Sequence, residues 1–330
     1  MNKKDFRIVF MGTPEFAVAS LDKLVHEGYA IPAVITVPDK PAGRGKKLQA
    51  SAIKQYAEAN GLKILQPEKL RSETFLTELS SLKADLFVVV AFRMLPEAVW
   101  NMPPKGTINL HASLLPQYRG AAPINRAVMN GEKVTGLTTF FLTHEIDTGN
   151  IIAQTELPIG FADNAGDMHD RMMIAGADLL AETVDKIMNN SYRVISQAEA
   201  IGSGHELRQA PKIFKEDCRI DWQQPGLTIY NQIRGLSPYP AAFTEIYGNE
   251  IEPYQLKIFK STFEPIDSDS VDALRSLSPG SIAIENRKSM RIATKDGWIS
   301  VKEVQQSGRK RMPVDDYLRG LAVCSGLKAR

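Results

Sequence analysis

The stretch DLFVVVAF, residues 85–92, decides the fold class, because the residues after its initial Asp form an unbroken apolar run about as long as one strand. Strands that are apolar on both faces are typical of parallel sheets that helices cover on both sides. A second strand-like run, KGTINLHA at residues 105–112, follows after a short gap. The two runs therefore predict two strands of an α/β sheet.

The sequence before these runs alternates between strand and helix patterns. The apolar run RIVFMG at 7–12 is followed by apolar residues at helical spacing up to Gly28, and then by the strand pattern IPAVITV at 31–37. The alternation continues in three further segments: ASAIKQYAEANG at 50–61, KILQP at 63–67 and ETFLTELSSL at 73–82. Repeated strand–helix–strand units predict a Rossmann-like, mostly parallel sheet, whose ligands lie beyond the carboxyl ends of the strands.

The second half of the chain has a different texture. Residues 135–159 predict a hairpin centred on residues 147–149, and residues 164–188 predict a long amphipathic helix. A polar stretch with Gly and Ser follows, and beyond Asp221 short alternating runs separated by turns predict a small antiparallel, OB-like barrel. We therefore predict three parts: a first domain at 1–190, a linker at 191–210 and a β-barrel domain at 211–330.

The composition, with 43% apolar and 24% charged residues, is that of an ordinary globular protein. No apolar run approaches the length of a membrane-spanning helix, and the start of the chain has no signal-peptide pattern, so we expect a cytoplasmic protein with no membrane contact. The two cysteines form neither a CxxC pair nor a Cys/His cluster, which argues against a zinc site and a disulfide framework. We expect no metal.

Positive charge concentrates in the segments 38–54 and 287–311, although the formal net charge of the whole chain is only +2. Local basic patches are typical of proteins that bind a polyanion such as nucleic acid. The positive charge of each segment, taken alone, is explained at least as well by an ordinary solvent-exposed surface. Binding of a polyanion and simple solvent exposure therefore both stay open at this point.

Two polar residues, Asn109 and His111, stand at the end of the second apolar run. Residues two apart in a strand point to the same face, so these side chains can converge on one ligand atom. An amide can donate a hydrogen bond to a developing oxyanion, and an imidazole can act as acid or base near neutral pH. The alternative is that both residues are ordinary capping or hydrogen-bonding groups.

A carboxylate is needed to orient the imidazole, and Asp147 on the predicted hairpin turn is the candidate for it. His144, three residues earlier, is interpreted as an exposed hairpin residue. The set of Asn, His and Asp comes without a recognisable Ser or Cys nucleophile. It therefore predicts direct acyl transfer to an amine, with no covalent enzyme intermediate.

Several segments spread along the chain resemble the folate-dependent formyltransferases. They are MGTPEFA at 11–17, PDKPAGRGKKL at 38–48, NLHASLLPQYRGAAPI at 109–124, IDTG at 146–149, KEDCRIDW at 215–222 and IRGLSPYPAAF at 233–243. The matches are colinear and span essentially the whole chain. The resemblance implies the formyltransferase fold with a C-terminal OB-like barrel.

Within that family, the chain is most similar to the members that transfer the formyl group of 10-formyltetrahydrofolate to the α-amino group of methionine on initiator tRNA. Asn109, His111 and Asp147 match the catalytic Asn, His and Asp of the family. The resemblance also places two groups on the folate side: Ser113, Leu114, Leu115 and Pro116 in one segment, and Phe92, Arg93, Met94 and Leu95 in a loop expected to border the pteridine.

The basic segment has a function in this family, where it enters the acceptor stem of the tRNA. The residues expected to contact the tRNA are Arg44, Lys46 and Lys47. The pteridine loop departs from the family pattern, because residues 91–96 are one residue shorter than usual and carry Arg93 where glycine is common.

Three other functions stay open beside this one. Glycinamide ribonucleotide formyltransferases and amino-sugar formyltransferases share the Asn, His and Asp pattern, but neither is expected to carry the basic segment together with a basic second domain. A non-catalytic RNA-binding protein with the same fold would bind tRNA without transferring a formyl group. In each case we expect no obligatory protein partner.

Overall fold

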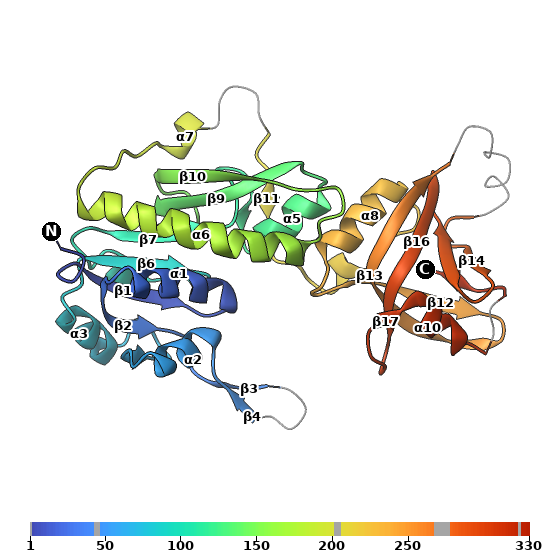
Figure 1. The fold of residues 1–330 in the computed structure, drawn as a ribbon, viewed down its shortest axis with the longest axis horizontal. Coiled ribbons are helices and arrows are strands. Elements are labelled where there is room, and N and C mark those ends of the chain that lie inside the picture. Colours follow the sequence, from blue (N-terminus) through green and yellow to red (C-terminus); the bar gives the residue numbers. More distant parts are fainter. Residues whose placement is uncertain (1, 43–46, 201–205, 267–277, 323–324) are drawn as a thin grey trace. The chain divides into compact units, whose positions relative to one another are not determined.

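The computed structural model describes residues 2–42, 47–200, 206–266, 278–322 and 325–330 (Figure 1). The chain divides into two compact units. The first unit comprises residues 1–120, 134–158 and 169–210, and the second comprises residues 121–133, 159–168 and 211–330. The predicted α/β fold with a C-terminal antiparallel β part is confirmed.

The first unit is built on a seven-stranded sheet with the order β10-β9-β7-β6-β1-β2-β5. Its strands are β1 (Arg7–Gly12), β2 (Ala30–Ile35), β5 (Ile64–Leu65), β6 (Leu86–Val90), β7 (Thr107–His111), β9 (Val134–Phe141) and β10 (Ile151–Pro158). Five neighbouring strands pair in parallel, in the order β7, β6, β1, β2 and β5. At the other edge, β9 is antiparallel to both β7 and β10. The sheet is therefore mostly parallel, as predicted.

Helices cover both faces of this sheet (Figure 1). The helices are α1 (Glu15–His26), α2 (Ala52–Ala59), α3 (Glu73–Ser81), α4 (Glu97–Trp100) and α6 (Ala165–Met188). On one face, Phe75 of α3 and Val99 of α4 pack in one buried cluster with Phe87 of β6. On the other face α6 lies so close to β7 that a Cβ atom on Gly176 would be 2.9 Å from the Cδ2 atom of Leu110.

This packing fixes the direction of the functional side chains on β7. In the parallel register, Phe87 pairs with Thr107 and Val89 pairs with Asn109. Because paired residues of neighbouring strands point to the same face, Asn109 and His111 share the face of Phe87, and Leu110 points toward α6. The polar pair therefore lies on the side of the sheet that α3 and α4 cover.

Short elements join these layers. They are β3 (Lys40–Ala42) and β4 (Lys47–Gln49), which form a two-stranded sheet, β8 (Arg119–Gly120), which pairs in parallel with β11 (Gln209–Ala210), and α7 (Gln197–Ala200). The described part of the predicted linker, 191–210, thus belongs to the first unit. It is tied there by β11 and by an antiparallel bridge between Ile195 and Ile151 of β10.

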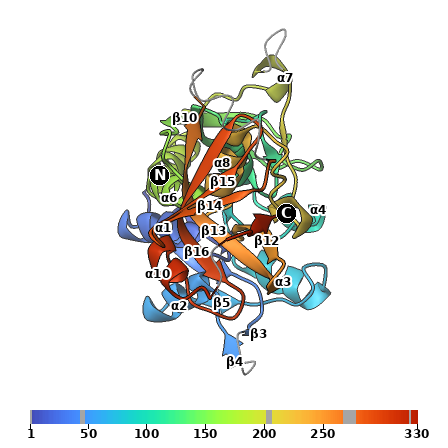
Figure 2. The ribbon, with the colours of Figure 1, turned by 90° about the vertical axis from the view of Figure 1, so that its right-hand side faces the viewer.

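The second unit is an antiparallel sheet curled into a half-barrel, seen best in Figure 2. Its strands are β12 (Ala242–Gly248), β13 (Ile251–Pro265), β14 (Ile282–Glu285), β15 (Ser289–Ala293), β16 (Gly297–Gln306), β17 (Met312–Pro313) and β18 (Lys328–Ala329). A bridge between Ser281 and Lys328 joins the two edges of the sheet. The helical elements are α5 (Pro123–Met129), η1 (Glu216–Cys218), α8 (Gly226–Gly235) and α10 (Val314–Arg319).

The second unit has a hydrophobic core of its own. Ile229 and Ile233 of α8 pack in it against Leu256 and Ile258 of β13 and against Ile299 of β16. The predicted OB-like barrel is confirmed at the level of this curled antiparallel sheet. No helix in the described ranges is both long and apolar enough to span a membrane.

Replacing Phe87 by alanine tests the packing that orients β7. Phe87 is 1% exposed and belongs to the cluster that joins α3 and α4 to the sheet. We expect Phe87→Ala to lower the free energy of unfolding of the first unit by about 3–5 kcal/mol, because it leaves a cavity. Denaturant unfolding followed by tryptophan fluorescence measures this change. Ile174→Ala on α6, where the side chain is 65% exposed, is the control and is expected to change it by less than about 1 kcal/mol.

Candidate active site

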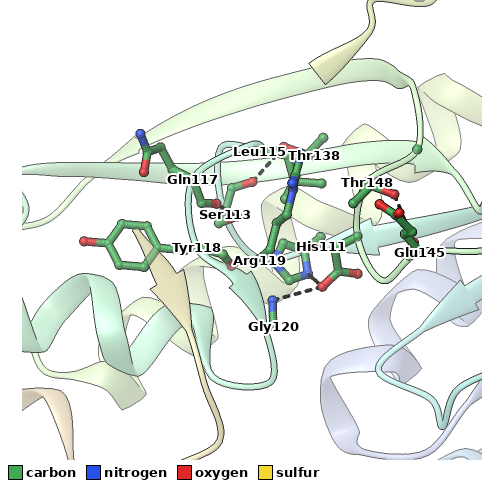
Figure 3. A network of polar contacts seen from close by, with 12 residues as sticks. His111, Ser113, Leu115, Gln117, Tyr118, Arg119, Gly120, Thr138, Glu145 and Thr148 are labelled. Carbon is green, nitrogen blue, oxygen red and sulfur yellow. Dashed lines mark hydrogen bonds and ion pairs between the residues drawn. The ribbon is translucent and has the colours of Figure 1, made fainter. Parts of the chain in front are cut away.

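The carboxyl end of β7 presents His111 in a buried, fully defined position. His111 is 7% exposed, and its Nε2 atom lies 2.9 Å from the carbonyl oxygen of Tyr118. A carbonyl oxygen only accepts hydrogen bonds, so Nε2 carries a hydrogen atom and donates a hydrogen bond to the carbonyl oxygen of Tyr118. The other ring nitrogen, Nδ1, lies 3.8 Å from the Oδ2 atom of Asp147 (Figure 3). That separation is too long for a hydrogen bond but close enough for electrostatic attraction.

Asp147 reaches this position from the turn between β9 and β10. Its backbone has φ of +54°, a left-handed conformation that is uncommon outside glycine but that Asp tolerates better than most residues. Its Oδ2 atom accepts a hydrogen bond of 3.0 Å from the backbone N–H of Gly120. The Oδ2 atom of Asp147 is therefore held between the His111 ring and the backbone N–H of Gly120, the last residue of β8.

Asn109 shares the face of β7 that carries His111. Its side chain is partly exposed, and within the described ranges it has no hydrogen-bond partner. The amide is therefore available to a ligand. The structure brings His111 and Asp147 together and places Asn109 on the same strand and face as His111. Their joint catalytic role stays a prediction.

The segment Ser113–Pro116 is committed to the interior of the first unit. The Ser113 hydroxyl donates to the carbonyl oxygen of Gln117 over 2.6 Å, and the N–H of Leu115 donates to the hydroxyl of Thr138 over 3.0 Å (Figure 3). Leu115 also packs in a buried cluster with Phe140. The side chains of Ser113, Leu115 and Pro116 are buried and that of Leu114 is partly buried. Their expected contact with folate stays a prediction.

A cavity of about 420 Å³ opens beside the loop that follows β6. This volume is within the range of small-molecule sites. The lining residues are Leu70, Arg71, Arg93, Met94, Leu95, Pro96, Glu97, Trp100 and His144. Three of the four loop residues expected to border the pteridine line it, and the fourth, Phe92, packs instead against the buried cluster under α3.

Arg93, which stands where the resemblance leads us to expect glycine, is held by backbone groups of a neighbouring turn. Its NH1 atom donates to the carbonyl oxygen of Glu68 over 3.0 Å, and NH2 donates to the carbonyl oxygen of Pro67. Burial lowers the pKa of the Arg93 guanidinium below its usual value. The side chain thus ties the shortened loop to the turn after β5, and only part of it faces the cavity.

The basic segments are less uniformly positive than the sequence suggests. At the base of β3, the Lys54 ammonium lies 2.6 Å from Asp39 and holds the pKa of that carboxyl below its usual value. Arg44 and Lys46 lie outside the described residues, and Lys47 begins β4. In the second unit Arg311 pairs with Glu303 over 2.6 Å, so part of the charge of segment 287–311 is compensated.

Comparison with known proteins identifies the family. The model of the formyl transferase family matches residues 6–184, and the model of the formyl transferase C-terminal domain matches residues 212–322. The chain belongs to the formyl transferase family.

Two curated relatives match over nearly their whole length. The chain is 53% identical over 328 residues to the methionyl-tRNA formyltransferase of Bacteroides thetaiotaomicron, with 99% of each chain covered. It is 56% identical over 321 residues to the methionyl-tRNA formyltransferase of Phocaeicola vulgatus, with 97% of each chain covered. The family resemblance inferred from the sequence is therefore confirmed, and the chain is a formyl-transferring enzyme.

Solved structures support the fold. The N-formyltransferase of Helicobacter canadensis, in complex with folinic acid and dTDP-3-aminofucose, matches with a TM-score of 0.63 and 24% identity over 91% of this chain and 99% of that one. HypX of Aquifex aeolicus, in complex with tetrahydrofolic acid, matches with a TM-score of 0.62 and 18% identity over 94% of this chain and 46% of that one. At this identity both likenesses establish the fold alone.

Sequence reasoning missed the backbone groups of the site. The carbonyl of Tyr118 and the N–H of Gly120 hold His111 and Asp147, yet any residue supplies such groups, so no pattern reveals them. His144 is exposed, as interpreted, but it also lines the cavity. No group of three or more His, Cys, Asp or Glu side chains in the described ranges is arranged to hold a metal ion.

Substitution of Gly149 tests the turn that carries Asp147. A Cβ atom at this position would lie 1.6 Å from the carbonyl oxygen of Phe141, so the backbone of the turn must move. We expect Gly149→Ala to lower the rate of formyl transfer by at least about 10²-fold, because displacements near 1 Å cost that much in an oriented site. The control is Gly320→Ala, whose nearest neighbour lies at 3.5 Å. Full activity of Gly149→Ala would contradict the proposed rigidity of the turn.

Proposed function

We propose that this chain transfers the formyl group of 10-formyltetrahydrofolate to the α-amino group of the methionine on initiator tRNA. The observation that carries the proposal is the pairing of His111, at the carboxyl end of β7, with Asp147. Asp147 lies on the turn between β9 and β10, and this turn also contributes His144 to the lining of the cavity. The names of the curated relatives support methionyl-tRNA as the acceptor. The folates named in the complexes of the structural relatives support the donor.

The reaction needs charge stabilisation at one oxygen. As the amine attacks the formyl carbon, a C–N bond forms and the formyl oxygen becomes negative. The Asn109 amide shares one face of β7 with the His111 ring, so it can donate a hydrogen bond to that oxygen beside the ring. Such preorganised donors are usually the largest single contribution to catalysis of acyl transfer.

A proton must then pass from the attacking amine to the folate nitrogen that leaves. Two oxygens, the carbonyl of Tyr118 and the carboxylate of Asp147, face the two nitrogens of the His111 ring. Asp147 faces the ring nitrogen that Tyr118 does not, so its carboxylate is placed to assist the movement of the proton, directly or through a water molecule.

The cavity is the proposed site of the pteridine. Arg93, Met94 and Leu95 line it, and the apolar surface of Trp100 suits a flat ring. We assign Ser113–Pro116 to the folate side through the course of their backbone, which leads from β7 to the groups that hold His111. No metal is needed for this reaction scheme.

The tRNA is proposed to contact Arg44, Lys46 and Lys47 in the basic segment, together with basic side chains of the second unit. Lysine and arginine neutralise phosphates, so this binding should weaken steeply with salt. We further propose that the enzyme acts in the cytoplasm, on free initiator Met-tRNA, without a membrane contact or an obligatory protein partner.

One assay tests the proposed acceptor. The purified chain is given 10-formyltetrahydrofolate and charged initiator tRNA, with glycinamide ribonucleotide as the competing amine. We expect formyl-methionyl-tRNA as the product and no transfer to the ribonucleotide. Preferential transfer to the ribonucleotide would assign the chain to another acceptor, and tRNA binding without transfer would make it a non-catalytic RNA-binding protein.

Variants of the catalytic residues separate chemistry from tRNA binding. His111→Ala and Asp147→Asn should lower kcat by at least about 10³-fold, and Asn109→Ala by roughly 10²- to 10³-fold, because each removes a group that acts on the transition state. The dissociation constant of initiator tRNA should stay within about 2-fold. The converse variant is Arg44→Ala, which should raise the KM for tRNA and leave that for folate unchanged. Equal losses of both functions in all four variants would contradict this division.

The role of the cavity is tested at Met94, which lines it and is 72% exposed. Met94→Ala should raise the KM for 10-formyltetrahydrofolate about 5- to 10-fold, through the loss of roughly 1 kcal/mol of apolar contact. The KM for tRNA and the thermal midpoint should not change. The matched control is Ile174→Ala, another exposed apolar side chain, and an unchanged folate KM in Met94→Ala would place the pteridine elsewhere.

A further inference from the structure

Gln197 occupies an unusual position for a residue of a polar connecting segment. It begins α7, yet it is only 3% exposed. An amide buried to this degree must satisfy its donors and acceptors within the protein, or its burial is costly. The partners of Gln197 therefore indicate what holds the segment in place.

Both ends of the Gln197 amide are fully used. Its Nε2 atom donates to the carbonyl oxygen of Asp147 over 2.8 Å and to that of Gly149 over 2.9 Å. Its Oε1 atom accepts from the guanidinium of Arg119, with 2.9 Å to Nε and 2.6 Å to NH2. The amide thus gives β8 and the Asp147 turn a second connection, beside the hydrogen bond from Gly120 to the Asp147 carboxylate.

These bonds close a ring of contacts around Asp147. Arg119 and Gly120 are consecutive residues of β8, and Gly120 donates to the carboxylate of Asp147. The backbone of Asp147 is held by Gln197, its side chain by Gly120, and Gln197 and Gly120 are linked through Arg119. Tyr118, the residue before Arg119, accepts the hydrogen bond of the His111 ring. One closed network therefore sets the position of the carboxylate relative to the imidazole.

The segment that presents Gln197 is itself anchored. Ile195 and Ile151 of β10 exchange two backbone hydrogen bonds of 2.9 Å each. Ser196 and Glu199 form a capping box, in which the N–H of Ser196 donates to Glu199 over 3.0 Å and the N–H of Glu199 donates to the Ser196 hydroxyl over 3.2 Å. Gln197 lies between these two fixed points, so its amide has little freedom to follow a moving turn.

We propose that Gln197 is a positioning residue for formyl transfer, which acts by clamping the Asp147 turn against Arg119. The proposal rests on the function proposed above and adds a residue to its machinery. The left-handed backbone at Asp147 is sparsely populated by itself. The two carbonyl oxygens that Gln197 binds belong to Asp147 and Gly149, so the amide holds the strained residue itself and the end of the turn that follows it.

The test variant is Gln197→Glu, which keeps the shape and an acceptor for Arg119 but removes both N–H donors. We expect kcat to fall roughly 10- to 100-fold, with the KM values for initiator tRNA and folate within about 2-fold, because the carboxylate of Asp147 loses its alignment. The matched control is Gln232→Glu. Gln232 likewise donates to two carbonyl oxygens, those of Asp217 and Arg219, over 3.0 Å each, but in the second unit. Its kcat should stay within about 2-fold of the wild type.

A double-mutant cycle distinguishes positioning from general stability. In single-turnover reactions with excess enzyme, Gln197→Glu should slow the Asp147→Asn enzyme by less than about 3-fold, since it acts through a carboxylate that is already gone. Independent, multiplicative losses would overturn the proposal, as would a change confined to KM. If Gln197→Glu does not fold at the assay temperature, Arg119→Ala gives the same comparison from the other side of the amide. If the wild-type protein itself shows no formyl transfer in this assay, the proposed function is wrong, and that outcome is distinct from a failure of the proposal for Gln197.

Discussion

The hydrogen bond from His111 Nε2 to the carbonyl oxygen of Tyr118 is the contact on which the rest of the site depends. It requires the chain to leave β7 and return within seven residues to the same ring. The buried segment Ser113–Pro116 makes this return possible, because Leu115 and the Ser113 hydroxyl fix its course in the interior. Once the segment has returned, the N–H of Gly120 lies within hydrogen-bond distance of the carboxylate of Asp147.

Burial gives these polar contacts their strength. The side chains of His111 and Asp147 are 8% and 12% exposed, whereas those of the surface pair Arg319 and Asp315 are 62% and 44% exposed. Exposed pairs are screened by water and salt and contribute little to stability, whereas a charge that develops beside a buried dipole interacts more strongly with it. Under the proposed function, the end of β7 supplies what a transition state for acyl transfer requires: oriented groups that need no reorganisation.

Much of this arrangement is predictable from the sequence, because apolar runs determine it. The runs at 85–92 and 105–112 require two buried strands, and strand periodicity then places Asn109 and His111 on one face. The segment 191–210 is different, since its apolar residues are scattered among polar ones and form no run that would indicate burial. Gln197 is buried there by hydrogen bonds to backbone carbonyls, and a partner that any residue can supply leaves no pattern in the sequence. Arg93 is predictable as an exception to its family pattern, but its partners at Pro67 and Glu68 are not.

The same reasoning explains how one fold can serve different amine acceptors. Each group that holds His111 and Asp147 belongs to the first unit, including Tyr118, Gly120 and Gln197. The second unit closes its own core around α8 and β13, and among the described residues none belongs to both this core and the network around His111. If the proposed function holds, we therefore expect substitutions that change the charge of the barrel to alter the recognition of the acceptor without changing the geometry of acyl transfer. Because the Asp147 turn depends on a segment at 195–199, the catalytic geometry is complete only when the chain beyond α6 has folded back onto the sheet.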